Sequence, residues 1–84
     1  MSFDRIGVIG GGAWGTALAQ VGASGGRDVL LWARETEVVE SVNADHENRA
    51  FLPGQKLSSS IRATGDLADL RPRHIVAQVH SERG

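Results

Sequence analysis

The fold of this chain is decided by residues 5–15, Arg-Ile-Gly-Val-Ile-Gly-Gly-Gly-Ala-Trp-Gly. An apolar run of strand length leads directly into a cluster of glycines, and a helical pattern begins at Ala13. Gly10, Gly12 and Gly15 have the G-x-G-x-x-G spacing that is typical of a dinucleotide-binding turn. This spacing alone is a weak signal, so the prediction depends on the strand before the glycines and the helix after them.

Each of the three glycines has its own expected role in such a turn. Gly10 is expected to let the backbone turn sharply out of the strand, and Gly12 to let a pyrophosphate approach the main chain. Gly15 is expected to let the new helix pack closely against the strand. The phosphates would then face free N–H groups of the first helical turn, where the helix dipole favours negative charge.

The rest of the chain alternates predicted strands and helices, a pattern that indicates βαβ units and a parallel sheet. The strands are predicted at residues 5–9, 29–33, 61–64 and 74–79, and the helices at 13–23, 36–43 and 66–70. A polar loop over 45–60 contains a Pro-Gly turn. These elements make up about one mononucleotide-binding half of a Rossmann-like α/β fold. Residues 1–84 are therefore expected to be an incomplete dinucleotide-binding domain.

Local signals mark the ends of the predicted helices. The first helix has Trp14, Leu18 and Val21 at helical spacing, and Ala17 and Ala19 are expected to keep it slim against the sheet. Gly25-Gly26 is expected to end it. Thr36 is the expected N-cap of the second helix, which we expect to fray near Asn43.

Composition and charge exclude several classes of function. The chain has 84 residues, no cysteine, 40% hydrophobic residues and a net charge of −1 with both signs interspersed. There is no basic stripe for nucleic acid, no thiolate zinc site and no apolar run long enough to span a membrane. His46, His74 and His80 lack metal-ligand spacing, so no metal site is predicted. A cytoplasmic location is the expectation.

Arg34 stands at the end of the second predicted strand, about where dinucleotide sites contact the adenine ribose. Sites that prefer NAD usually have an acidic residue there, whereas a guanidinium can hold the 2′-phosphate of NADP. The alternative is a solvated arginine at a strand end. We favour the cofactor role and predict binding of NADP, or of both NADP and NAD.

Three stretches together resemble bacterial NAD(P)-dependent glycerol-3-phosphate dehydrogenase. They are residues 10–19 with the Gly-Thr-Ala-Leu-Ala run, residues 31–34 (Leu-Trp-Ala-Arg), and the loop His46-Glu47-Asn48 followed by Phe51-Leu52-Pro53-Gly54. The loop is the most distinctive, since a generic dinucleotide fold does not require it. The likeness covers roughly residues 5–70 and fades after Leu70.

The resemblance implies reversible hydride transfer between NAD(P)H and dihydroxyacetone phosphate, a step toward glycerophospholipids. It also implies that Ala13, Trp14 and Arg34 line the cofactor, although Trp14 could instead pack in the core. The family's catalytic lysines and helical substrate domain lie beyond residue 84. We therefore expect no catalytic residue here and no activity from this chain alone, whereas the full-length parent is expected to be a homo-oligomer. Two alternatives are a non-catalytic nucleotide-binding module and a fragment of another reductase, such as ketopantoate reductase.

Overall fold

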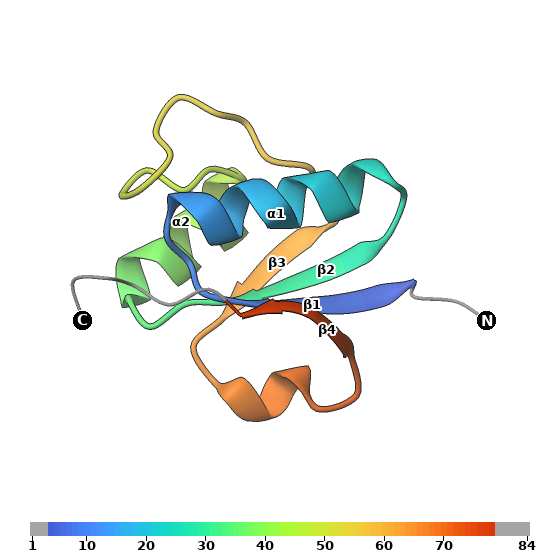
Figure 1. Ribbon diagram of the computed structural model, residues 1–84. Helices are drawn as coiled ribbons and strands as arrows, with labels where there is room; N and C mark the ends of the chain where they lie inside the picture. The colour runs from blue at the N-terminus through green and yellow to red at the C-terminus, as the bar shows by residue number, and fades with distance from the viewer. Residues whose placement is uncertain (1–3, 79–84) are drawn as a thin grey trace.

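The computed structural model describes residues 4–78, which form a four-stranded parallel sheet flanked by helices (Figure 1). The elements in chain order are β1 (Arg5–Ile9), α1 (Ala13–Ser24), β2 (Asp28–Trp32), α2 (Thr36–Asp45), β3 (Ile61–Thr64), the 3₁₀ helix η1 (Leu67–Leu70) and β4 (His74–Gln78). The strand order is β3-β2-β1-β4. The second and third strands are therefore added on one side of β1, and β4 pairs with β1 on the other side. This arrangement confirms the predicted Rossmann-like half. Position 79, predicted as the last residue of the fourth strand, lies outside the described residues.

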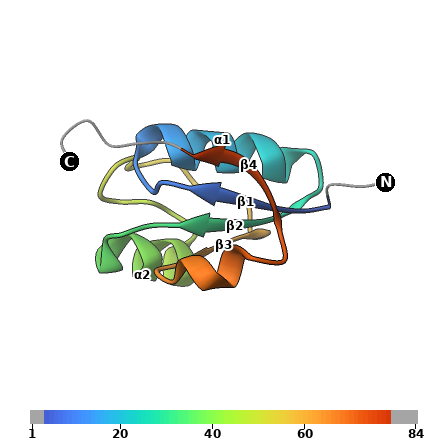
Figure 2. The ribbon, with the colours of Figure 1, turned by 60° about the horizontal axis from the view of Figure 1, so that its bottom comes forward.

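The two α-helices lie on one face of the sheet and η1 lies on the other (Figures 1 and 2). Alternate strand residues face α1 and α2, and they form one buried apolar cluster with both helices. From the strands and the residue after β2 the cluster contains Ile6, Val8, Val29, Leu31, Ala33, Ile61 and Ala63, and from the helices and the loop Ala19, Ala23, Val38, Val42 and Leu57. None of the helices in residues 4–78 has the length and apolar character that crossing a membrane requires.

The face of α1 that packs on the sheet consists of small residues. Gly15, Thr16, Ala19 and Ala23 are buried, and they recur at helical spacing. Ala19 is fully buried, as expected of a residue that keeps the helix slim, whereas Ala17 is only partly buried. The larger apolar residues at helical spacing do not mark the buried face, because Trp14 is 71% exposed and Val21 is 67% exposed. α1 lies so close to the sheet and to the preceding turn that large side chains do not fit beneath it.

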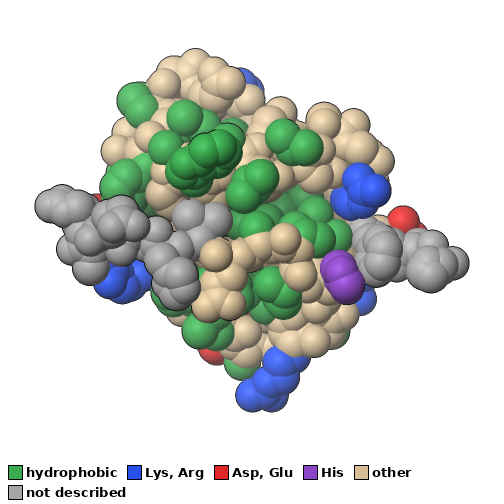
Figure 3. Space-filling model, viewed as in Figure 1, with side chains coloured by type: hydrophobic (Ala, Val, Ile, Leu, Met, Phe, Trp, Pro, Cys, Tyr) green, Lys and Arg blue, Asp and Glu red, His purple; other side chains and the backbone are tan. Residues whose placement is uncertain are grey.

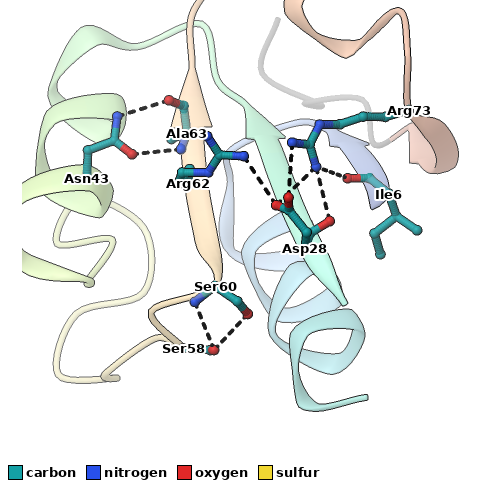
Figure 4. Close-up of polar contacts among 8 residues, drawn as sticks. All are labelled: Ile6, Asp28, Asn43, Ser58, Ser60, Arg62, Ala63 and Arg73. Carbon is teal, nitrogen blue, oxygen red and sulfur yellow. Dashed lines mark hydrogen bonds and ion pairs between the residues drawn. The ribbon is translucent and has the colours of Figure 1, made fainter. Parts of the chain in front are cut away.

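The end of α1 agrees with the glycine signal, whereas the limits of α2 do not match the local sequence signals. Gly25 caps α1, and Gly26 follows with φ +85°. The N-cap of α2 is Glu35, which makes no side-chain capping bond, so the prediction for Thr36 is wrong by one residue. Fraying at Asn43 is also wrong. The Asn43 side chain donates to the Ala63 carbonyl and accepts from the Ala63 N–H, at 2.9 and 2.8 Å, which joins α2 to the edge of β3 (Figure 4).

An ion cluster centred on Asp28, the first residue of β2, joins the amino ends of the strands (Figure 4). The Arg73 side chain is 3% exposed and donates to both carboxylate oxygens of Asp28, at 3.2 and 3.5 Å, and to the carbonyls of Ile6 and Asp28. Arg62 donates to the same carboxylate at 3.2 Å. Burial by itself would raise the pKa of Asp28, but the hydrogen bonds and charges of Arg73 and Arg62 outweigh it. The pKa of Asp28 is therefore lowered from its ordinary value.

Candidate cofactor site

The glycine cluster connects β1 to α1 at the carboxyl end of the sheet. β1 lies between β2 and β4, and open α/β sheets bind their ligands at the point where the strand order reverses in this way. Gly10 has φ +125°, a conformation that suits glycine, and its N–H donates to the Trp32 carbonyl at 2.9 Å. The expected sharp turn at Gly10 is confirmed.

Close packing explains two of the neighbouring glycines. An ideal Cβ at Gly15 would lie 1.7 Å from the Gly10 carbonyl oxygen, so α1 begins directly against the turn. A Cβ at Gly11 would lie 2.5 Å from the Cβ of Ala33. Gly15 therefore permits the close approach that the motif predicts, although its nearest contact is the turn rather than the strand. The motif spacing gives no indication that Gly11 is also required.

Gly12 differs from these glycines because its surroundings are open. A Cβ built at Gly12 meets no atom within 4 Å. Its φ of −75° is accessible to any residue, and it serves as the N-cap of α1 without a side-chain capping bond. The fold thus gives no steric or backbone reason for glycine here, and a ligand can come directly onto the main chain.

The first turn of α1 presents N–H groups to this open surface. Within residues 4–78, the N–H groups of Gly12, Ala13 and Trp14 donate to no backbone carbonyl, whereas the Thr16 N–H donates to the Gly12 carbonyl at 3.0 Å. The first turn of α1 also contains no acidic residue. The positive end of the helix dipole is therefore uncompensated, an arrangement that can bind a phosphate.

The remaining predicted cofactor residues lie at the surface near this turn. Ala13 is exposed. The exposure of Trp14 excludes the alternative that it packs in the core. The Arg34 side chain is 62% exposed and pairs with Glu35 at 3.7 Å. Because β1 and β2 are parallel neighbours, Arg34 lies at the same edge of the sheet as the glycine turn.

Two polar side chains that no sequence motif singles out lie behind the turn. Asn48 and Thr16 are each 0% exposed. The Asn48 Nδ2 donates to the Gly11 carbonyl at 2.8 Å and to the Thr16 Oγ1 at 2.7 Å. Asn48 belongs to the distinctive loop noted in the sequence, but nothing local indicates that it reaches a residue 37 positions earlier.

The family model for the N-terminus of NAD-dependent glycerol-3-phosphate dehydrogenase matches residues 5–81. The chain belongs to this family. The match extends past Leu70, where the likeness noted in the sequence fades. Membership of the glycerol-3-phosphate dehydrogenase family also decides against the ketopantoate reductase alternative.

Individual relatives carry the same description. The glycerol-3-phosphate dehydrogenase (NAD(P)+) of Parvibaculum lavamentivorans is 64% identical over 69 residues, which cover 82% of this chain and 21% of that protein. The enzyme of that name from Erythrobacter litoralis is 66% identical over 66 residues, or 79% of this chain and 20% of that protein. The chain thus spans about one fifth of the length of these relatives.

Solved structures agree with the sequence relatives. The glycerol-3-phosphate dehydrogenase of Coxiella burnetii superposes with a TM-score of 0.78 at 33% identity, over 88% of this chain and 23% of that one. The enzyme of Saccharomyces cerevisiae superposes with a TM-score of 0.82 at 30% identity, over 93% of this chain and 26% of that one.

Proposed function

We propose that this chain binds the adenosine and pyrophosphate side of NADP or NAD, as the amino-terminal part of a bacterial glycerol-3-phosphate dehydrogenase. The observation that carries the proposal is the open, uncapped start of α1 at Gly12, placed at the carboxyl end of β1. Gly10 and Gly15 shape the turn, Ala13 offers its backbone N–H, and Trp14 forms a wall of the cleft.

The parent enzyme would transfer a hydride between the nicotinamide and dihydroxyacetone phosphate, in the cytoplasm and as a homo-oligomer. No residue of this chain is assigned a catalytic role in that reaction. Among residues 4–78, no three His, Asp or Glu side chains come together to hold a metal ion. The contribution of the chain is to bind and orient the cofactor.

The two edges of the sheet support the proposal that this domain is one half of a larger one. At one edge, the Asn43 side chain forms hydrogen bonds with the N–H and the carbonyl of Ala63 in β3. At the other edge, β4 exposes Ile75 and Val76 at 40% and 50%. Apolar side chains also gather over α1 above this edge (Figure 3). Strands of parallel sheets are normally buried on both faces, so the exposed side chains of β4 are suited to be covered by a further part of the parent enzyme.

A Gly12→Ala substitution tests the site. The added methyl group meets no protein atom, so the free energy of unfolding should change by less than about 1 kcal/mol, the usual scale of N-cap effects. The methyl group would stand between the main chain and the pyrophosphate, and we expect the dissociation constant for NADPH to rise at least about tenfold. Isothermal titration calorimetry measures binding, and urea unfolding followed by circular dichroism measures stability.

Gly25→Ala is the matched control for Gly12→Ala. Gly25 caps the other end of α1, about 20 Å away from Gly12. Its φ is −86°, and a Cβ there would crowd only the end of the flexible Arg27 side chain, with the Gly22 carbonyl oxygen at an ordinary contact distance of 3.5 Å. Gly25→Ala should bind NADPH as the unsubstituted chain does. A folded chain that gives no binding heat at millimolar NADPH, or equal binding by Gly12→Ala, would contradict the proposed site.

Arg34→Ala tests the choice of cofactor. Loss of the guanidinium removes a charged partner for the 2′-phosphate, so we expect the dissociation constant for NADPH to rise roughly tenfold while that for NADH changes little. Arg71→Ala, at the exposed end of η1, removes the same charge elsewhere and should change neither constant. An equal response of both cofactors to Arg34→Ala would remove the specificity role of Arg34.

A further inference from the structure

The Asn48 side chain joins the loop after α2 to the glycine turn and to the start of α1. Its side chain is fully buried, and both donors of its amide are used, on the Gly11 carbonyl at 2.8 Å and the Thr16 Oγ1 at 2.7 Å. Its Oδ1 accepts from the Phe51 N–H at 3.2 Å. Three of the four hydrogen-bonding positions of the amide are therefore occupied, one by the glycine turn, one by the first turns of α1 and one by its own loop.

The contact with Gly11 fixes the direction of the next peptide group. A peptide unit is planar, and the bond between Gly11 and Gly12 is not cis, so the carbonyl of Gly11 and the N–H of Gly12 point in opposite directions. Because the Gly11 carbonyl points inward to a fully buried side chain, the Gly12 N–H points outward. The surroundings of Gly12 are open as well, since a Cβ built there would meet no atom within 4 Å.

The turn needs such an external contact because it consists of three consecutive glycines. Glycine has no Cβ to restrict φ and ψ, so the peptide groups between Gly10, Gly11 and Gly12 can rotate at little steric cost. A turn that visits several orientations binds more weakly, since only the fraction of molecules with the correct orientation is competent.

Asn48 can hold the Gly11 carbonyl in place because hydrogen bonds also fix the position of its own loop. Its carbonyl accepts from the Leu52 N–H at 2.8 Å, which folds the loop back on itself. The loop is also anchored to α2, where the Ser41 hydroxyl donates to the Glu47 carbonyl and accepts from the Arg49 N–H. The loop lies beside the first turn of α1 (Figures 1 and 2).

We propose that Asn48 is a positioning residue, which holds the Gly11–Gly12 peptide so that the Gly12 N–H donates to the cofactor pyrophosphate. This inference rests on the proposed function and deepens it. It also explains why the chain contains the distinctive loop after α2, which a generic dinucleotide fold does not require. The loop is the support that orients the phosphate-binding amide from behind.

The test uses the ¹⁵N-labelled full chain, with Asn48→Asp compared with the unsubstituted protein. The substitution keeps the shape of the side chain but replaces its two donors with an acceptor facing the Gly11 carbonyl. We expect the ¹H–¹⁵N resonance of Gly12 to broaden or split. The dissociation constant for NADPH should rise about tenfold, with a similar loss for inorganic pyrophosphate.

Asn43→Asp is the control, because Asn43 also donates from its amide to a backbone carbonyl, but at the edge of β3. It should lose stability without a change at Gly12 or in binding. If Asn48→Asp does not fold, Thr16→Val replaces it. That variant removes the hydroxyl that accepts from Asn48 and that itself donates to the Gly11 carbonyl at 3.5 Å, so it loosens the same carbonyl from the other side. We expect Thr16→Val to weaken binding about threefold and to perturb the Gly12 resonance.

Failures of the two proposals are distinguishable. If the unsubstituted chain is folded but NADPH shifts no resonance of the turn, the proposed function fails and the role of Asn48 fails with it. If the unsubstituted chain binds NADPH, but a folded Asn48→Asp (or Thr16→Val in its place) binds equally well with the Gly12 resonance unchanged, only the positioning role is overturned. Weakened binding in Asn43→Asp to the same degree would also overturn it, because the loss would then be one of general stability.

Discussion

Replacing Gly15 with alanine is expected to disrupt both the phosphate turn and the stability of the chain. Helix propensity alone would favour alanine over glycine by about 1 kcal/mol inside a helix. At Gly15, however, the new Cβ would lie 1.7 Å from the Gly10 carbonyl oxygen and 2.8 Å from the Gly10 carbonyl carbon. Both are backbone atoms, so α1 must move away from the turn rather than a side chain turning aside.

We expect this movement to cost at least about 3 kcal/mol, the upper range for overpacked sites. A chain of this length has a total stability of roughly 4–13 kcal/mol, so the loss is a large fraction of it. Urea unfolding measures the loss, and calorimetry should detect no NADPH binding.

Gly12→Ala is the internal comparison for Gly15→Ala, because the same methyl group is added three residues earlier in open space. The pair separates two effects: Gly12→Ala should lose binding and keep stability, whereas Gly15→Ala should lose both. A Gly15→Ala chain that is as stable as the unsubstituted one, as propensity alone predicts, would mean that α1 does not approach the turn as closely as described.

Asp28→Asn is expected to give the second large loss of stability. The substitution leaves the buried Arg73 guanidinium without its countercharge, and breaking a fully buried pair in this way costs about 3–5 kcal/mol. The Asp28 side chain is itself 43% exposed, so water screens part of the interaction. We therefore expect a loss of roughly 2 kcal/mol at pH 7.

The pH dependence of stability follows from the lowered pKa of Asp28. A carboxyl group whose pKa is lower in the folded than in the unfolded state stabilises the fold at pH values above its unfolded pKa. That stabilisation is lost as the pH falls through the folded-state pKa. The unsubstituted chain should thus lose stability on acidification below about pH 4, and Asp28→Asn should show a flatter profile there.

Asp66→Asn is the matched control for Asp28→Asn. Asp66 caps η1 by accepting from the Ala68 N–H at 3.0 Å, and asparagine caps about as well as aspartate. The free energy of unfolding of Asp66→Asn should change by less than about 0.5 kcal/mol at pH 7. If Asp28→Asn unfolds at the same urea concentration as Asp66→Asn at pH 7, the ion cluster does not stabilise the sheet.

The sequence alone predicted the elements of the fold and their order. The apolar runs and the glycine cluster placed every strand and helix to within a residue or two, because strand and helix periodicity and glycine turns are local properties of the backbone. The sharp turn at Gly10 and the end of α1 at Gly25 were predictable for the same reason. The resemblance, carried by three short stretches, led to the correct family.

Only the tertiary structure decided which face of α1 is buried and what holds the glycine turn. The sequence offered two signals for α1, large apolar residues at helical spacing and the small residues Ala17 and Ala19. The close approach at Gly15, and at Gly22, whose Cβ would lie 2.6 Å from Ile6 Cδ1, placed the face with Gly15, Thr16, Ala19 and Ala23 against the sheet. The contacts of Asn48 with Gly11 and of Arg73 with Asp28 join residues 37 and 45 positions apart. Such contacts depend on how distant segments meet in space, which the local pattern of a single chain does not encode.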